Sequence, residues 1–182
     1  MKKIIMICTV FITVSIASSA QSWPTSVTGI TTIANDSVVT EGNLSTGKII
    51  SDLRWASSSA VACFTTSQFH RYQGNHVFYG ITIKPGSIVK VKAKPANNTE
   101  EISLYGYMMD KNDYHMVPAL EQCITCEADY KRDKPMKGKV LTDEREIEFR
   151  NPTSETYNII IGVAAPKGVT ERKFSLMIKT VI

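Results

Sequence analysis

The residues with the clearest chemical potential are two cysteines separated by two residues, Cys123 and Cys126. Such a pair carries out thiol–disulfide exchange when its first thiol lies at a helix N-terminus, where the helix dipole lowers the thiol pKa. Here the pair is followed by Glu127 and Asp129, and neighbouring acidic groups raise a thiol pKa. The sequence therefore favours a structural disulfide over a redox-active pair.

A third cysteine, Cys63, lies in the small, apolar segment 56–64. The alternatives are a local Cys123–Cys126 ring and a bridge from Cys63 to either of the other two. The longer closure would stabilise the fold by about 4 kcal/mol in the chain-entropy treatment of disulfides. A zinc half-site is the less favoured alternative, because it needs two further ligands. Because the cysteine number is odd once Cys8 is removed with the N-terminal segment, one thiol stays free or pairs between molecules.

The histidines do not form a recognisable catalytic motif. Neither Gly-x-Ser-x-Gly nor His-Glu-x-x-His occurs, so His70, His76 and His115 are interpreted as structural. The segment 110–113 places oxygen ligands at a calcium-like spacing but lacks the glycine and the distal glutamate of an EF-hand loop. We therefore predict a protein that is not an enzyme and has no metal or other cofactor, with calcium as the alternative.

Two groups of side chains could bind a ligand at the surface. The basic group is Lys90, Lys92, Lys131 and Arg132, which could bind an acidic polysaccharide or another anionic surface. The aromatic group is Tyr72, Tyr105, Tyr107 and Tyr114, which could form a flat platform for sugar rings. The alternative is structural: the lysines would protect an edge strand from aggregation, and the tyrosines would pack against a sheet.

The N-terminal segment predicts export. Lys2 and Lys3 precede the apolar run 4–16, and small residues at 18–20 supply a cleavage site, so residues 1–20 are interpreted as a signal peptide of a type common in bacteria. The apolar run is too short for a membrane span. Removal of two lysines lowers the basic count from 21 to 19 against 17 acidic residues, and a net charge of +2 does not indicate nucleic-acid binding. The predicted location is the periplasm or the cell exterior.

The remainder of the chain reads as strands separated by turns. Residues 77–83 and 88–93 alternate in polarity around Pro85-Gly86, and they predict a hairpin with a type II turn, one face buried and one wet. Further strands are expected at 101–109, 146–150, 157–163 and 172–182, of which 157–163 is the most apolar and should be central. We predict a single all-β domain over 21–182, an antiparallel β-sandwich or jelly roll. Residues 21–76 are its less regular N-terminal portion, and 110–139 is a long loop carrying the cysteine pair.

From residue 77 onward the order of these signals resembles the bacterial pre-peptidase C-terminal domain. The resemblance rests on Val77-Phe78-Tyr79, the Pro85-Gly86 turn, the strand 88–91, Ile102-Ser103-Leu104-Tyr105, and 151–157 ahead of Ile159-Ile160-Ile161. It implies a β-sandwich and a non-catalytic binding or stabilising role.

The sequence therefore predicts an exported, non-catalytic β-sandwich that binds a polysaccharide, another surface polymer or a protein. Two alternatives remain: an exported thiol–disulfide or metal-binding protein that uses Cys123 and Cys126, and a structural subunit of an envelope assembly that joins its neighbours through a sheet edge.

Overall fold

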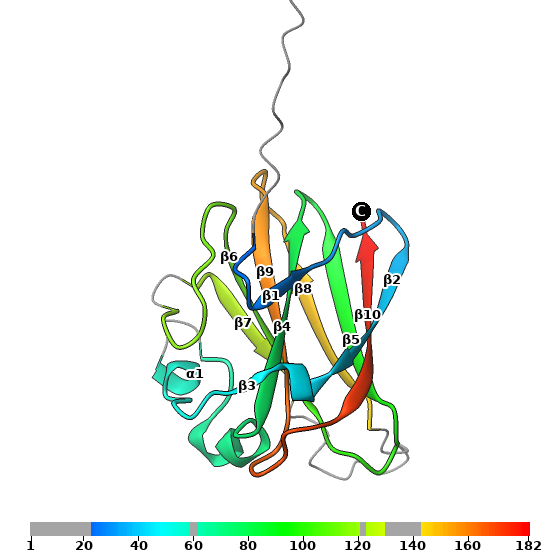
Figure 1. Cartoon of the computed structure of the whole chain (residues 1–182). Helices are drawn as coiled ribbons and strands as arrows, with labels where there is room; N and C mark the ends of the chain where they lie inside the picture. Colours follow the sequence, from blue (N-terminus) through cyan, green and yellow to red (C-terminus); the bar gives the residue numbers. More distant parts are fainter. Residues whose placement is uncertain (1–22, 59–61, 121–122, 130–142) are drawn as a thin grey trace, which may run out of the picture.

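The computed structural model describes residues 23–58, 62–120, 123–129 and 143–182, and within these ranges the chain folds as two packed β-sheets (Figure 1). One sheet has the strand order β1-β4-β9-β6-β7, with β3 paired to β4, and the other has the order β2-β10-β5-β8. All pairs between these strands are antiparallel except β1 with β4. The predicted all-β sandwich is confirmed.

The larger sheet contains β1 (Val27–Gly29), β3 (Lys48–Ile49), β4 (Asn75–Ile83), β6 (Ser103–Asp110), β7 (Thr125–Ala128) and β9 (Tyr157–Ala164). The smaller sheet contains β2 (Ser37–Asn43), β5 (Ile88–Pro95), β8 (Arg145–Arg150) and β10 (Lys173–Val181). Short helical turns lie at η1 (Leu44–Thr46), α1 (Trp55–Ser58) and η2 (Thr66–Arg71). The apolar segment predicted as central is β9, which lies between β4 and β6.

The Pro85-Gly86 turn is present, but the predicted hairpin is wrong. Gly86 has φ +70°, and the Ser87 amide donates to the Lys84 carbonyl at 3.3 Å, as a type II turn requires. The two strands that the turn joins do not pair with each other: β4 pairs with β9, and β5 pairs with β10 and β8. The turn therefore carries the chain from one sheet to the other.

The inner core fills the space between the two sheets. β5 alternates strictly, with Val89, Val91 and Ala93 fully buried and the lysines between them turned outward. From the larger sheet, Ile81, Leu104 and Ile161 pack against them in the same cluster. Period-two alternation therefore predicts the inward face correctly for both sheets.

The larger sheet is buried on its second face as well, which corrects the prediction of a wet face on β4. A second apolar cluster contains Phe78 and Tyr105 from the sheet and covers them with Trp55 and Phe64 from the segment around α1. Along β4, every residue except Thr82 is buried. The sheet is therefore the middle layer between two apolar cores.

The N-terminal portion and the long loop contain short elements. Residues 48–55 form a strand only at β3, and residues 69–76 include the end of η2 and the start of β4. The long excursion 110–139 contains strand β7, while its residues 121–122 and 130–139 lie outside the described residues, as does the predicted signal peptide. No helix in the described ranges is long and apolar enough to cross a membrane.

Candidate functional site

A disulfide joins Cys63 to Cys126, which is one of the bridges left open by the sequence. Cys126 lies on β7, directly opposite Tyr107 of β6, while Cys63 follows α1 and donates its backbone N–H to Ala56 at 2.8 Å. The Cα atoms are 4.9 Å apart across a sequence separation of 63 residues. The bridge therefore fastens the α1 segment to the edge of the larger sheet.

Cys123 carries a free, buried thiol. Its Sγ donates to the carbonyl of Thr125 at 3.1 Å. Burial raises the pKa of the thiol from 9.0 to about 11, and the nearby carboxylate of Asp113 adds to this effect. The reactive form of cysteine is the thiolate. At neutral pH this residue is a protonated, inert core side chain.

The predicted sugar platform is wrong for Tyr72, Tyr105 and Tyr107, which are fully buried. Tyr72 stacks on Phe64 with ring centroids 3.9 Å apart, and Tyr105 and Tyr107 fill the second core from β6. Tyr114 is half-buried and meets Trp23 edge-on at 5.5 Å.

The predicted basic patch is not free in the described part of the chain. Lys90 lies 3.3 Å from Glu148, and Lys92 lies 3.4 Å from Glu144 and 3.5 Å from Glu146. The carboxylates come from β8 or the residue before it, and β5 is an inner strand rather than a protected edge. The lysines of β5 are therefore neutralised by the carboxylates beside them. Lys131 and Arg132 lie outside the described residues.

His76 is buried with hydrogen-bond partners on both ring nitrogens. Its Nδ1 is 2.9 Å from the Tyr105 hydroxyl, and its Nε2 is 2.6 Å from the Tyr72 carbonyl. Burial lowers its pKa from 6.5 to about 4, although the hydrogen bond to the Tyr72 carbonyl opposes the shift. The ring is neutral at pH 7 and has no nitrogen left to activate a hydroxyl group.

The other predicted ligand groups are engaged in local turns. His115 is exposed and lies 2.5 Å from Asp113 through Nδ1. The Asp110 carboxylate accepts from the Asn112 amide at 3.0 Å. No cluster of three or more metal-ligating side chains occurs in the described ranges. His70 is exposed at the end of η2.

The candidate site is a groove of about 620 Å³ at the edge of the larger sheet, where β4 is flanked by two short strands. β3 pairs with β4 at Asn75 and His76, and β1 pairs with it from Phe78 to Gly80, so neither short strand pairs with Val77. The groove is lined by Thr25, Ser26, Thr28, Thr46, Gly47, Lys48, Ile49, Ile50, His76, Val77, Phe78, Tyr79, Met116 and Val117.

The groove combines hydroxyl groups on one wall with aliphatic side chains on the other. Thr28 is exposed on β1, and Ile49 on β3 leaves 59% of its surface to solvent. Gly47, just before β3, allows this wall to lie close to β4, because a Cβ atom at position 47 would collide with the carbonyl of His76. Lys48 is the one fully charged side chain among the lining residues. The groove therefore suits a largely uncharged ligand with apolar groups.

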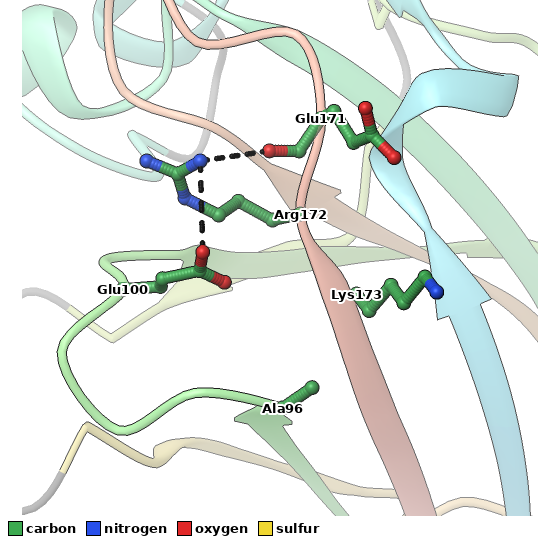
Figure 2. Close-up of a pocket in the computed structure, with 5 residues that line it drawn as sticks. All are labelled: Ala96, Glu100, Glu171, Arg172 and Lys173. Atoms are coloured by element: carbon green, nitrogen blue, oxygen red, sulfur yellow. Dashed lines mark hydrogen bonds and ion pairs between the residues drawn. The ribbon is translucent and has the colours of Figure 1, made fainter.

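A second hollow, of about 370 Å³, lies where β10 begins (Figure 2). Arg172 donates to the Glu171 carbonyl at 3.0 Å and lies 3.8 Å from the Glu100 carboxylate. Figure 2 shows Lys173 pointing away from Arg172. Because the arginine is already engaged with its neighbours, this hollow is a weaker candidate for a charged ligand.

Sequence reasoning missed the groove because its walls come from the least regular part of the chain. The hydroxyl-rich run 25–28 and the exposed Ile49 lie in the N-terminal portion, at β1 and β3, which are only three and two residues long. One sequence feature could have indicated the groove. The pair Ile49-Ile50 lies in a stretch with no long strand beside it to bury both side chains.

No family model matches the chain, and the curated proteins contain no match to it. The chain is similar in structure to a periplasmic inhibitor of g-type lysozyme from Aeromonas hydrophila, at 13% identity over 85% of this chain and 96% of that one (TM-score 0.40). It is also similar to a surface-associated, copper-binding protein of Methylomicrobium album BG8, at 9% identity over 85% and 98% of the two chains (TM-score 0.47).

A third similar structure is the pre-peptidase C-terminal domain of a collagenase from Bacillus anthracis, at 8% identity over 87% of this chain and all of that one (TM-score 0.42). The resemblance predicted from the sequence is therefore found as a structural similarity as well. At these identities and TM-scores, the three comparisons concern the fold alone.

Proposed function

We propose that the protein is an exported, non-catalytic β-domain that binds an extended segment of a partner protein in the groove beside β4. The observation that carries the proposal is the exposed Ile49, which borders a groove of about 620 Å³ between two short edge strands. Aliphatic anchors beside free strand edges suit an extended peptide, whose side chains alternate between contact and solvent.

Export is supported by the signal-like N-terminus and by the disulfide. Disulfides persist in the periplasm and outside the cell, whereas the cytosol keeps thiols reduced. The Cys63–Cys126 bridge closes a long stretch of chain and lies in the second core. Both features support a mature protein in the periplasm or outside the cell.

A binding role is supported by the state of the groups that could do chemistry. The single imidazole at the groove, that of His76, has both nitrogens engaged, so it does not activate Ser26 or Thr28 as a nucleophile. The free thiol of Cys123 has a raised pKa. The residues that line the groove therefore provide apolar contact surface and hydroxyl groups but no activated nucleophile.

A protein partner is favoured over a polysaccharide by the aromatic side chains of the groove. Sugar rings bind on exposed aromatic faces, but Phe78 and Tyr79, the aromatic residues that line the groove, are only 8% and 6% exposed. The most exposed apolar side chain of the lining is Ile49 on β3. Aliphatic side chains of this kind pack against other aliphatic side chains rather than against sugar rings.

The test is selection of displayed random peptides on the immobilised mature protein, with a glycan array in parallel. We expect peptides with alternating apolar residues to be enriched, and we expect Ile49→Asp to lose them. Ile33→Asp is the matched control, because Ile33 is similarly exposed, at 54%, and does not line the groove. Peptides that bind the Ile49→Asp variant equally well would contradict the proposal, as would glycan binding without peptide binding.

A further inference from the structure

We infer that a second copy of this chain pairs with the free edge of β2, which extends the smaller sheet from one molecule into the next. β2 is the outermost strand of the order β2-β10-β5-β8, and Figure 1 shows it at the outside of the molecule, next to β10. This surface is separate from the groove lining, so the inference goes beyond the proposed function.

The hydrogen bonds to β10 fix which backbone groups of β2 are free. At one end the Leu44 amide donates to the Arg172 carbonyl at 2.9 Å, and at the other the Thr180 amide donates to the Asp36 carbonyl at 3.1 Å. Residues of an antiparallel strand alternate in the side to which their N–H and C=O groups point. The even-numbered residues therefore face β10, and the odd-numbered residues from Ser37 to Asn43 face outward.

Two of these outward groups are already used, and they mark the ends of the free edge. The Ser37 amide donates to the Asp36 carboxylate at 2.7 Å, and the Asn43 carbonyl accepts from the Thr46 hydroxyl at 2.8 Å. The groups without a partner among the described residues are the Ser37 carbonyl, the Asn43 amide, and both backbone groups of Val39 and Glu41.

These free groups are self-complementary about one two-fold axis. If Thr40 lies on the axis, Val39 of each copy faces Glu41 of the other, and the Asn43 amide meets the Ser37 carbonyl. Every free group then has a partner. A register centred on Glu41 would set two carboxylates opposite each other, and one centred on Val39 would leave the Asn43 amide without its partner.

The edge also lacks the features that usually prevent such pairing. Proteins protect free edges with lysine, proline, bulges or very short strands. β2 has seven residues, its one charged side chain is Glu41, and Val39 leaves 59% of its surface exposed. By contrast, β8 at the opposite edge carries Glu146, Glu148 and Arg150, and β1 is three residues long.

The test is sedimentation velocity of the mature protein over a concentration series, with Glu41→Pro and Glu41→Gln as a matched pair. Proline removes an N–H that faces outward and leaves the bonds to β10 intact, whereas glutamine keeps that N–H and removes the charge. We expect the wild type and Glu41→Gln to form dimers as concentration rises, and Glu41→Pro to remain monomeric at an unchanged secondary-structure content.

Cross-linking tests the register. In a Cys123→Ala background, Val39→Cys and Glu41→Cys chains mixed together should form mixed disulfide dimers in preference to dimers of either chain alone. A wild type that stays monomeric at all concentrations would overturn the inference, as would a Glu41→Pro variant that dimerises as well as the wild type. Preferential cross-linking of Val39→Cys to itself would overturn the register.

Discussion

Replacing Cys63 and Cys126 together by alanine measures how strongly the disulfide stabilises the second core. The bridge spans a sequence separation of 63 residues, and a loop of that length corresponds to about 4 kcal/mol in the chain-entropy treatment. Both sulfurs lie in the apolar cluster that includes Phe64 and Tyr107, so their removal also loses packing. For a chain of this size we expect a decrease in Tm of about 8–16 °C.

The assay is urea unfolding followed by tryptophan fluorescence, with and without a reducing agent. Reduction should lower the free energy of unfolding of the wild type most of the way to that of the double variant, which lacks the packing of the sulfurs as well, and it should leave the double variant unchanged. Cys123→Ala is the control, because it removes one buried cysteine side chain and keeps the bridge. We expect it to lower the free energy of unfolding by about 1 kcal/mol.

Two results would refute this reasoning. A loss below about 1 kcal/mol in the double variant would mean that the bridge does not restrict the unfolded chain as its length implies. A Cys123→Ala variant that is destabilised as much as the double variant would mean that Cys123 is part of the bridge. Peptide mapping without reduction should give one linked pair, containing Cys63 and Cys126.

Further predictions concern pH, a buried amide and processing. Folding lowers the pKa of His76 from 6.5 to about 4, so between these pH values the unfolded chain binds a proton that the folded chain does not. The contribution of His76 to stability is therefore complete above about pH 6.5, and about 3 kcal/mol is lost as the pH falls to about 4. Urea unfolding should show this loss in the wild type but not in His76→Gln. The buried Asn151 donates to the carbonyls of Lys84 at 3.0 Å and Glu155 at 2.7 Å, so Asn151→Ala should lower the free energy of unfolding by about 2–3 kcal/mol, against little change for the exposed Asn97→Ala. The intact mass of the exported protein should correspond to a chain that begins at residue 21, and a mass that retains residues 1–20 would contradict the signal peptide.

The strands were predictable from the sequence, but their partners were not. The alternation in β5 and the apolar run of β9 depend on local burial, and both strands lie where the sequence places them. The Pro85-Gly86 turn has the expected geometry and nevertheless joins two sheets. Whether a turn closes a hairpin or crosses a sandwich depends on long-range pairing, here of β4 with β9 and of β5 with β10.

The candidate site was less predictable, because the fold buries three of the four tyrosines with apparent binding chemistry, Tyr72, Tyr105 and Tyr107. On β4 and β6, aromatic side chains and glycine occupy the positions where a half-exposed strand would carry polar residues, as at Phe78, Gly80 and Tyr105. This pattern is typical of a strand covered on both faces. The cover comes from the segment that carries Cys63, which the disulfide fastens to Cys126 on β7, and this pairing is a long-range contact that the sequence leaves open.

This second cover also limits where the proposed partners can bind. Both faces of the larger sheet are used for packing, and on the outer face of the smaller sheet the lysines of β5 are paired with glutamates, as Lys90 is with Glu148. Among the described residues, the two most exposed aliphatic side chains, Ile49 on β3 and Val39 on β2, both lie on edge strands. A partner that gains both hydrogen bonds and apolar contact must therefore approach the sandwich at its edges.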